Sequence, residues 1–161
     1  MAKLLPCIAV LLAATFAGPS RAQEFNRANS LINDAAFELD HGHFREGVKL
    51  AEEALRSGAV SADNYAGLYN NLCIGMTGLQ RFDEALDYCN RALELSPRSW
   101  VFYNNRANIY FHQGQYDRAL AEYYKAMTFS EGTSILMKNI NLTLRKRGVP
   151  GAVTTAPEKS S

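Results

Sequence analysis

The sequence lacks a charge imbalance and contains no basic run interleaved with aromatic residues. It has 17 Lys and Arg against 16 Asp and Glu in 161 residues, so its net charge is +1. A nucleic-acid groove needs clustered basic and aromatic side chains, and we therefore predict no nucleic-acid partner. The hydrophobic share of 47% and the charged share of 20% are ordinary for a globular chain of one domain.

Residues and motifs for chemistry are also scarce. The chain has three histidines, and neither the pair His41 and His43 nor the distant His112 has the spacing of a zinc motif. No phosphate loop, dinucleotide fingerprint or Gly-x-Ser-x-Gly motif occurs. We therefore expect no catalytic residue, no metal site and no cofactor, and we interpret the histidines as exposed residues at helix ends and turns.

No apolar run is long enough to cross a membrane as a helix. The longest run, at 4–17, has 14 residues, whereas a helical span needs about 20. Lys3 precedes the run, helix-breaking residues follow it, and small residues stand three and one before a cut after Ala22. This pattern predicts a cleaved signal peptide at 1–22, with an uncleaved membrane anchor as the alternative. The mature chain, 23–161, would then fold in an oxidising compartment.

What the sequence does contain is an internal repeat. The stretch QYDRALAEYYKAM, from Gln115, matches RFDEALDYCNRAL thirty-four residues earlier, and the match extends over a whole unit. A sustained period of 34 residues is typical of helical repeat proteins. Two helical stretches are expected in each unit, at 66–77 and 82–95 and again at 100–113 and 116–129, with Gly78 and Gly114 in the connections. The paired residues include Tyr69 and Tyr103, Asn71 and Asn105, Phe82 and Tyr116, Ala85 and Ala119, and Ala92 and Ala126.

The positions of small and aromatic residues in this period resemble the tetratricopeptide repeat family. The unit at 100–133 supplies Tyr103, Ala107, Tyr110, Ala119, Tyr123 and Ala126, and the unit at 66–99 supplies Tyr69, Met76, Ala85, Ala92 and Pro97. Residues 28–65 form a degenerate first unit, as a terminal repeat with one side in water can be. The resemblance implies an all-α fold, a right-handed α-solenoid of about three helix hairpins.

The C-terminal part predicts one further helix and a tail. In the segment 134–147, Leu136, Ile140 and Leu144 recur at intervals of four, with basic residues elsewhere, so an amphipathic helix can cap the last repeat. A helix at a membrane surface is the alternative. The segment 148–161 has no periodicity, and we expect it to be disordered.

The resemblance also implies where a ligand would bind. In this family the first helices of successive repeats line a concave groove for an extended peptide or a partner's helix. The corresponding residues here are Asn70, Asn71, Ile74, Val101, Asn104, Asn105, Asn108, Phe111 and His112. Asparagine amides can bond a peptide backbone without requiring charge, or they can bridge neighbouring helices instead. None of these positions holds Lys or Arg, which argues against the acidic chaperone tails that some members bind. The implied function is a non-enzymatic adaptor whose protein or peptide partner the sequence does not name.

Cys73 and Cys89 are the two cysteines left after signal removal. Two cysteines in an exported chain favour a disulfide, and the resemblance places both on faces that pack together. They would be one helical turn, about 5.4 Å of rise, out of direct opposition, so the Cα separation is marginal against a limit of about 6.8 Å. The alternative is two small buried thiols.

The distribution of charge along the chain is compatible with a second class of function, self-assembly. The net charge is −4 over 23–65 and +4 over 134–161, while the two middle units are close to neutral. An acidic front and a basic back could pair head to tail in a self-assembling or structural module of a cell-envelope complex, although solvated termini explain the same values. The signal and the resemblance to short exported members of the family predict a periplasmic or secreted protein without a membrane span after cleavage.

Overall fold

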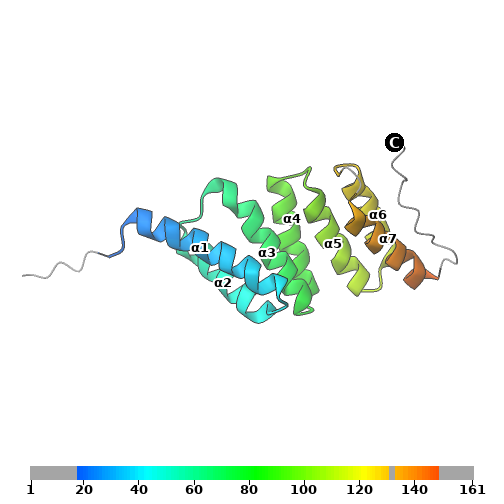
Figure 1. The fold of residues 1–161 in the computed structure, drawn as a ribbon, viewed down its shortest axis with the longest axis horizontal. Helices are drawn as coiled ribbons and strands as arrows, with labels where there is room; N and C mark the ends of the chain where they lie inside the picture. The colour runs from blue at the N-terminus through cyan, green and yellow to red at the C-terminus, as the bar shows by residue number, and fades with distance from the viewer. Residues whose placement is uncertain (1–17, 131–132, 149–161) are drawn as a thin grey trace, which may run out of the picture.

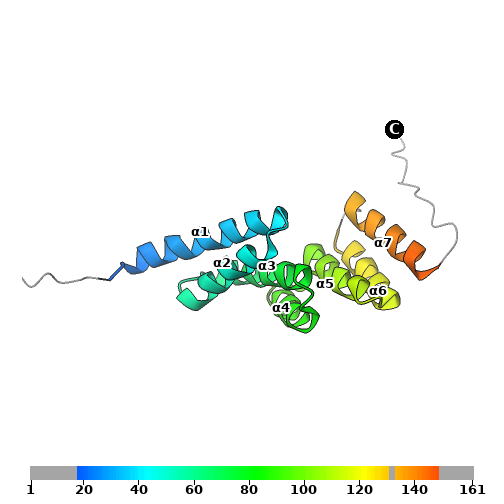
Figure 2. The ribbon, with the colours of Figure 1, turned by 90° about the horizontal axis from the view of Figure 1, so that it is seen from below.

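The computed structural model describes residues 18–130 and 133–148, and these residues form an all-α structure. Within these two ranges, seven α-helices and one 3-10 helix follow one another, with α1 and α7 as the first and last helix of the stack (Figures 1 and 2). Their bounds are α1 Arg21–Asp40, α2 Phe44–Ser57, the 3-10 helix Ala62–Asn64, α3 Tyr65–Gly78, α4 Phe82–Leu95, α5 Trp100–His112, α6 Tyr116–Met127 and α7 Ser134–Arg147. This arrangement confirms the predicted α-solenoid of helix hairpins. Most of the predicted signal peptide, 1–17, and the predicted tail from 149 lie outside the described residues.

The helices of the two clear repeats lie where the 34-residue period places them. α4 spans 82–95 as predicted, and the ends of α3, α5 and α6 differ from the prediction by one or two residues. Within each hairpin the two helices meet through residues with no exposed surface, among them Ala85, Ala92, Ala119 and Ala126. Small side chains at these positions allow the helix axes to approach closely, which is why the period can be recognised from the sequence.

The first helix begins earlier than the sequence led us to expect. The first repeat was predicted from residue 28, but α1 starts at Arg21. Its start is fixed by Ser20, whose hydroxyl accepts from the Gln23 backbone N–H at 3.3 Å, while the Gln23 side chain accepts from the Ser20 N–H at 2.7 Å. This reciprocal pair satisfies two backbone donors at the helix end. The predicted cut after Ala22 would remove that cap.

The turn between α3 and α4 contains a residue that the sequence did not single out. Gly78, expected in this connection, is the last residue of α3, and a side chain there would overlap the Phe44 ring. The left-handed turn position is Gln80, with φ of 60°, and its equivalent in the next repeat is Gly114, with φ of 73°. Gly78 is therefore needed for close packing, while the turn places a non-glycine residue in a region that usually favours glycine.

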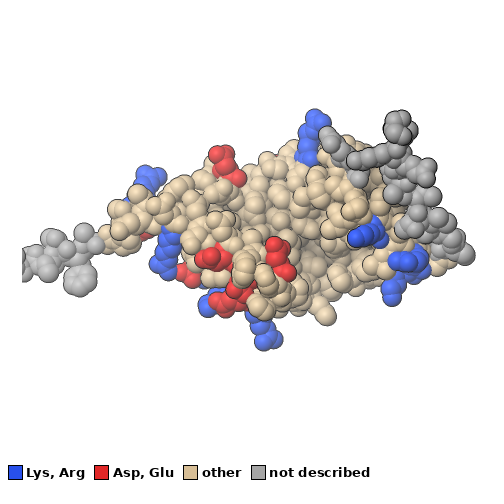
Figure 3. Space-filling view, in the orientation of Figure 1, with Lys and Arg blue, Asp and Glu red and all other residues tan. Residues whose placement is uncertain are grey.

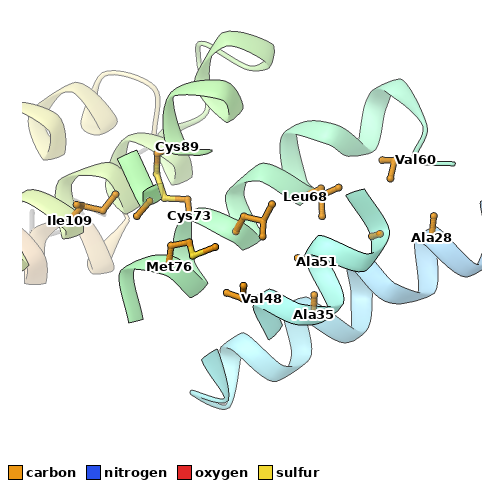
Figure 4. Close-up of a cluster of buried hydrophobic side chains, with 13 residues drawn as sticks. Ala28, Ala35, Val48, Ala51, Val60, Leu68, Cys73, Met76, Cys89 and Ile109 are labelled. Atoms are coloured by element: carbon orange, nitrogen blue, oxygen red, sulfur yellow. A yellow bond between two sulfur atoms is a disulfide. The ribbon is translucent and has the colours of Figure 1, made fainter. Parts of the chain in front are cut away.

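The middle hairpin holds the two cysteines against each other. The Cα atoms of Cys73 and Cys89 are 5.2 Å apart and their sulfur atoms are 2.01 Å apart. Figure 4 shows the disulfide that joins them. A Cα separation that we expected to be marginal is thus well inside the usual range for a disulfide. Both residues have no exposed surface and belong to the core cluster that joins the first two hairpins to Ile109 of α5.

A second core cluster joins the third hairpin to α7. Leu136 and Ile140 are 0% and 3% exposed and pack with Tyr110, Leu120 and other residues of α5 and α6. α7 therefore covers the end of the third hairpin, as the amphipathic pattern indicated. Among the described residues, no helix is both long and apolar enough to span a membrane.

Candidate functional site

The candidate site is the face formed by the first helix of each hairpin. α1 contacts α3, and α3 contacts α5, although each pair is separated in sequence by the second helix of a hairpin. α7 begins 34 residues after α5, and it lies in the register of a first helix of a fourth repeat. The predicted groove residues come from α3 and α5, so the structure brings them to one face.

Asparagine side chains connect each first helix to the one before it. The Asn71 amide donates to the Ile32 backbone oxygen at 3.1 Å, the Asn105 amide to the Asn70 side-chain oxygen at 2.8 Å, and the Asn139 amide to the Asn104 side-chain oxygen at 2.8 Å. We call these three bonds the asparagine ladder. The ladder repeats once per helix pair and fixes the register of neighbouring first helices.

The ladder assigns a structural role to part of the predicted groove. Asn71 and Asn104 are only 8% and 6% exposed, and the Asn104 amide also donates to the Asn105 oxygen at 3.3 Å. These three side chains therefore bridge helices, which was the alternative interpretation of the asparagines. Replacing them would disturb the stacking of the repeats.

Asn70 and Asn108 differ from the other three predicted groove asparagines because only their oxygens are engaged within the described residues. The Asn70 oxygen accepts from Asn105 at 2.8 Å, and the Asn108 oxygen accepts from the Tyr123 hydroxyl at 2.6 Å. Burial raises the pKa of Tyr123 well above its usual value, so the hydroxyl keeps its proton and continues to donate. With each oxygen held, the amide N–H groups are oriented and remain available to a ligand.

The remaining predicted groove residues are mostly apolar. Ile74, Val101 and Phe111 are half-buried, and His112 is exposed, with its ring 5.7 Å from the Phe111 ring in an edge-on arrangement. None of the four is Asp, Glu, Lys or Arg. The centre of the face is thus an uncharged surface with two oriented amide donors.

α7 adds cations that the sequence reasoning assigned only to a cap. Ile135 and Leu142 are 48% and 38% exposed, and Lys138 and Arg145 lie exposed on the same side of the helix. The predicted groove positions hold no Lys or Arg, and these two cations lie on α7, outside the residues that the sequence reasoning assigned to the groove. The 34-residue spacing between Trp100 and Ser134 was the signal that could have placed α7 in the series.

Other candidate positions lie away from this face. A hollow of about 690 Å³ near the α4 end is lined by Tyr65, Tyr69, Arg91 and Leu95, and the Arg91 guanidinium lies 5.9 Å from the centre of the Tyr69 ring. At the α1–α2 turn, His43 bonds Glu38 at 2.7 Å and is exposed, as predicted for a turn histidine. Within the described part of the chain, no three His, Cys, Asp or Glu side chains gather as metal ligands would.

The comparisons with known proteins agree with the repeat. A family model described as tetratricopeptide repeat matches residues 88–121. A solved tetratricopeptide-like protein from Chlorobium tepidum is 19% identical, with 78% of this chain and 95% of that chain covered and a TM-score of 0.66. The first such domain of human RPAP3 is 15% identical, with 76% and 94% covered and a TM-score of 0.66. The first repeat domain of Spaghetti, solved with the HSP90 peptide SRMEEVD, is 16% identical, with 74% and 92% covered and a TM-score of 0.62. These likenesses show the fold, and no curated protein sequence matches the chain.

Proposed function

We propose that this chain, a member of the tetratricopeptide-repeat family, is a non-enzymatic adaptor that binds an extended peptide or a partner's helix across its first helices. A solved protein of the same fold is bound to a peptide, which supports this class of ligand without identifying one for this chain. The proposal concerns the face of α3, α5 and α7 described above.

The observation that carries the proposal is the pair of oriented amide donors. Asn70 and Asn108 each have a fixed oxygen, through Asn105 and Tyr123, and an amide nitrogen without a partner in the described residues. An extended peptide carries a carbonyl oxygen at every residue, so two donors on neighbouring helices can bind its backbone whatever its sequence. Half-buried Ile74 and Phe111 offer apolar contacts for its side chains.

The test removes the donors while the internal bonds remain. In the double variant Asn70→Asp and Asn108→Asp, each carboxylate still accepts from Asn105 or Tyr123 but no longer donates. A photo-crosslinking amino acid at Ile74 should capture a discrete partner in the native host, and the double variant should reduce that capture at least tenfold. Circular dichroism should show unchanged helicity.

Asn90 provides a matched control on the other layer. Its oxygen accepts from Arg106 at 2.8 Å, so Asn90→Asp makes the same chemical change on α4 and should leave capture at Ile74 intact. A crosslinker at Tyr124, which is 49% exposed on α6, should not capture the same partner. Equal capture from Ile74 and Tyr124, or equal loss in Asn90→Asp, would show that binding does not use this face.

We further propose that the chain is exported to a periplasm or secreted after loss of residues 1–22, and that the Cys73–Cys89 bridge forms there. The proposal is supported by the charged start and apolar run of the leader and by the fit of the two cysteines to disulfide geometry. Cell fractionation with N-terminal sequencing tests it. A chain that retains residues 1–22 and fractionates with the cytoplasm would contradict the export.

A further inference from the structure

The α1 end of the solenoid exposes a position that the inner repeats bury. In α3, α5 and α7, the residues at one equivalent position are Gly75, Ile109 and Thr143, and all three are buried against the preceding hairpin. The equivalent residue of α1 is Phe37, which has no preceding hairpin to pack against and is 60% exposed. A large aromatic side chain at the open end of a stack is costly to leave in water.

Acidic residues flank Phe37 on α1. Asp34 and Asp40 are exposed three residues to either side of it. The His41 ring lies 4.2 Å from the Phe37 ring and holds it against the end of the helix. We call Asp34, Phe37 and Asp40 the α1 strip.

The exposed side of α7 has the opposite character. Ile135 and Leu142, 48% and 38% exposed, alternate along the helix with exposed Lys138 and Arg145. We call these four residues the α7 strip. α7 contains four basic residues and no acidic one, and the face in Figure 3 shows only basic side chains at its end of the molecule while acidic ones gather over the first hairpin.

We propose that the α7 strip of one copy is the docking site for the α1 strip of a second copy. The spacings agree: Asp34 and Asp40 are six residues apart, about 9 Å along a helix, and Lys138 and Arg145 are seven apart, about 10.5 Å. Phe37 lies between the two acids as Leu142 lies between the two bases, so the apolar side chains meet when the charges pair. Within the described residues, none of these four charged side chains is in an ion pair.

The geometry fixes the kind of assembly. The two strips lie on the first and the last helix of the stack, which stand apart in Figures 1 and 2, so one copy does not pair its own strips and each contact between two copies leaves one strip of each copy free. Such a contact is heterologous, and it extends into open chains or closes into a ring according to the rotation between successive copies. A contact between two single helices is also small, so the association is weak and is weakened further when salt screens the charges.

The test uses one blocked variant for each end. In protein purified as the host produces it, at several hundred micromolar and low salt, sedimentation should show association that falls at least tenfold in strong salt. Phe37→Arg removes the apolar contact and places a cation before the basic α7 strip, whereas Leu142→Asn removes the apolar contact at the other end without adding a charge that the acidic α1 strip would attract. Each variant alone should be monomeric, whereas an equimolar mixture should form a one-to-one dimer that grows no further, because one intact strip of each kind remains.

Leu95 provides the matched control. It is 53% exposed on α4 and belongs to neither strip, so Leu95→Arg should associate as the unaltered chain does. A wild-type chain that stays monomeric at low salt overturns the proposal. So does a mixture of the two blocked variants that stays monomeric, or a blocked variant that still dimerises alone. Any of these outcomes leaves the crosslinking at Ile74 untouched, so the proposed adaptor function is tested separately.

Discussion

Reduction of the Cys73–Cys89 bridge should lower the free energy of unfolding by about 3 kcal/mol. The two cysteines are 16 residues apart in sequence, and the loss of loop-closure entropy in the unfolded chain for a loop of this length corresponds to about 3 kcal/mol at 25 °C. Both side chains have no exposed surface, so the folded hairpin keeps its packing when the bond is absent. For a chain of this size a destabilisation of 3 kcal/mol lowers Tm by about 10 °C.

The assay is thermal unfolding of the oxidised protein beside protein that was unfolded and refolded in reductant. Reduction must pass through the unfolded state, since the bridge is buried, and a thiol count in denaturant confirms that it is complete. The double variant Cys73→Ala and Cys89→Ala serves as the control and should show no dependence of Tm on reductant. If fully reduced protein keeps the Tm of the oxidised protein, the entropic reasoning is wrong for this loop.

Two further predictions concern single residues. Arg106, which is 20% exposed, donates to both carboxylate oxygens of Glu122 and to Asn90. Arg106→Met should therefore lower the free energy of unfolding by roughly 2 kcal/mol, because it leaves a half-buried carboxylate unpaired. Urea unfolding should show that adding Glu122→Met restores part of this stability, and independent effects of the two substitutions would contradict the argument. Gln80 has φ of 60° where Gly114 occupies the equivalent turn, so Gln80→Gly should stabilise the chain by about 0.5 kcal/mol as relief of strain outweighs the added entropy of the unfolded state. A lower urea midpoint for Gln80→Gly would refute this argument.

The helix pairs could be predicted because each repeat has small and large residues at the same positions. Ala85 and Ala92 face a neighbouring helix, and their partners Ala119 and Ala126 do so again 34 residues later, so the period alone sets the bounds of α4. The start of α1 was missed although Ser20 and Gln23 form a readable capping signal, because the segment was interpreted as part of a leader.

The roles of the groove residues could not be predicted in the same way. Asn70 and Asn71 are neighbours in sequence and both were predicted as ligand contacts. Asn71 is buried and bonds the Ile32 backbone, whereas the Asn70 amide nitrogen has no partner among the described residues. Which of the two amides bonds the preceding helix depends on how closely the first helices approach one another. That distance is set by packing across the whole hairpin. The place of α7 in this series was missed for a related reason, since the bond from Asn139 to Asn104 on α5 depends on how the helices pack.

The asparagine ladder has a consequence for how such a chain can change length. Each ladder amide reaches only the preceding repeat, and the two side-chain pairs are both 35 residues apart. A tandem duplication of residues 66–99 would therefore carry its own donor in the copy of Asn71 and its own acceptor in the copy of Asn70. The new unit would bond both neighbours without any other substitution, so gene duplication can lengthen this solenoid one repeat at a time.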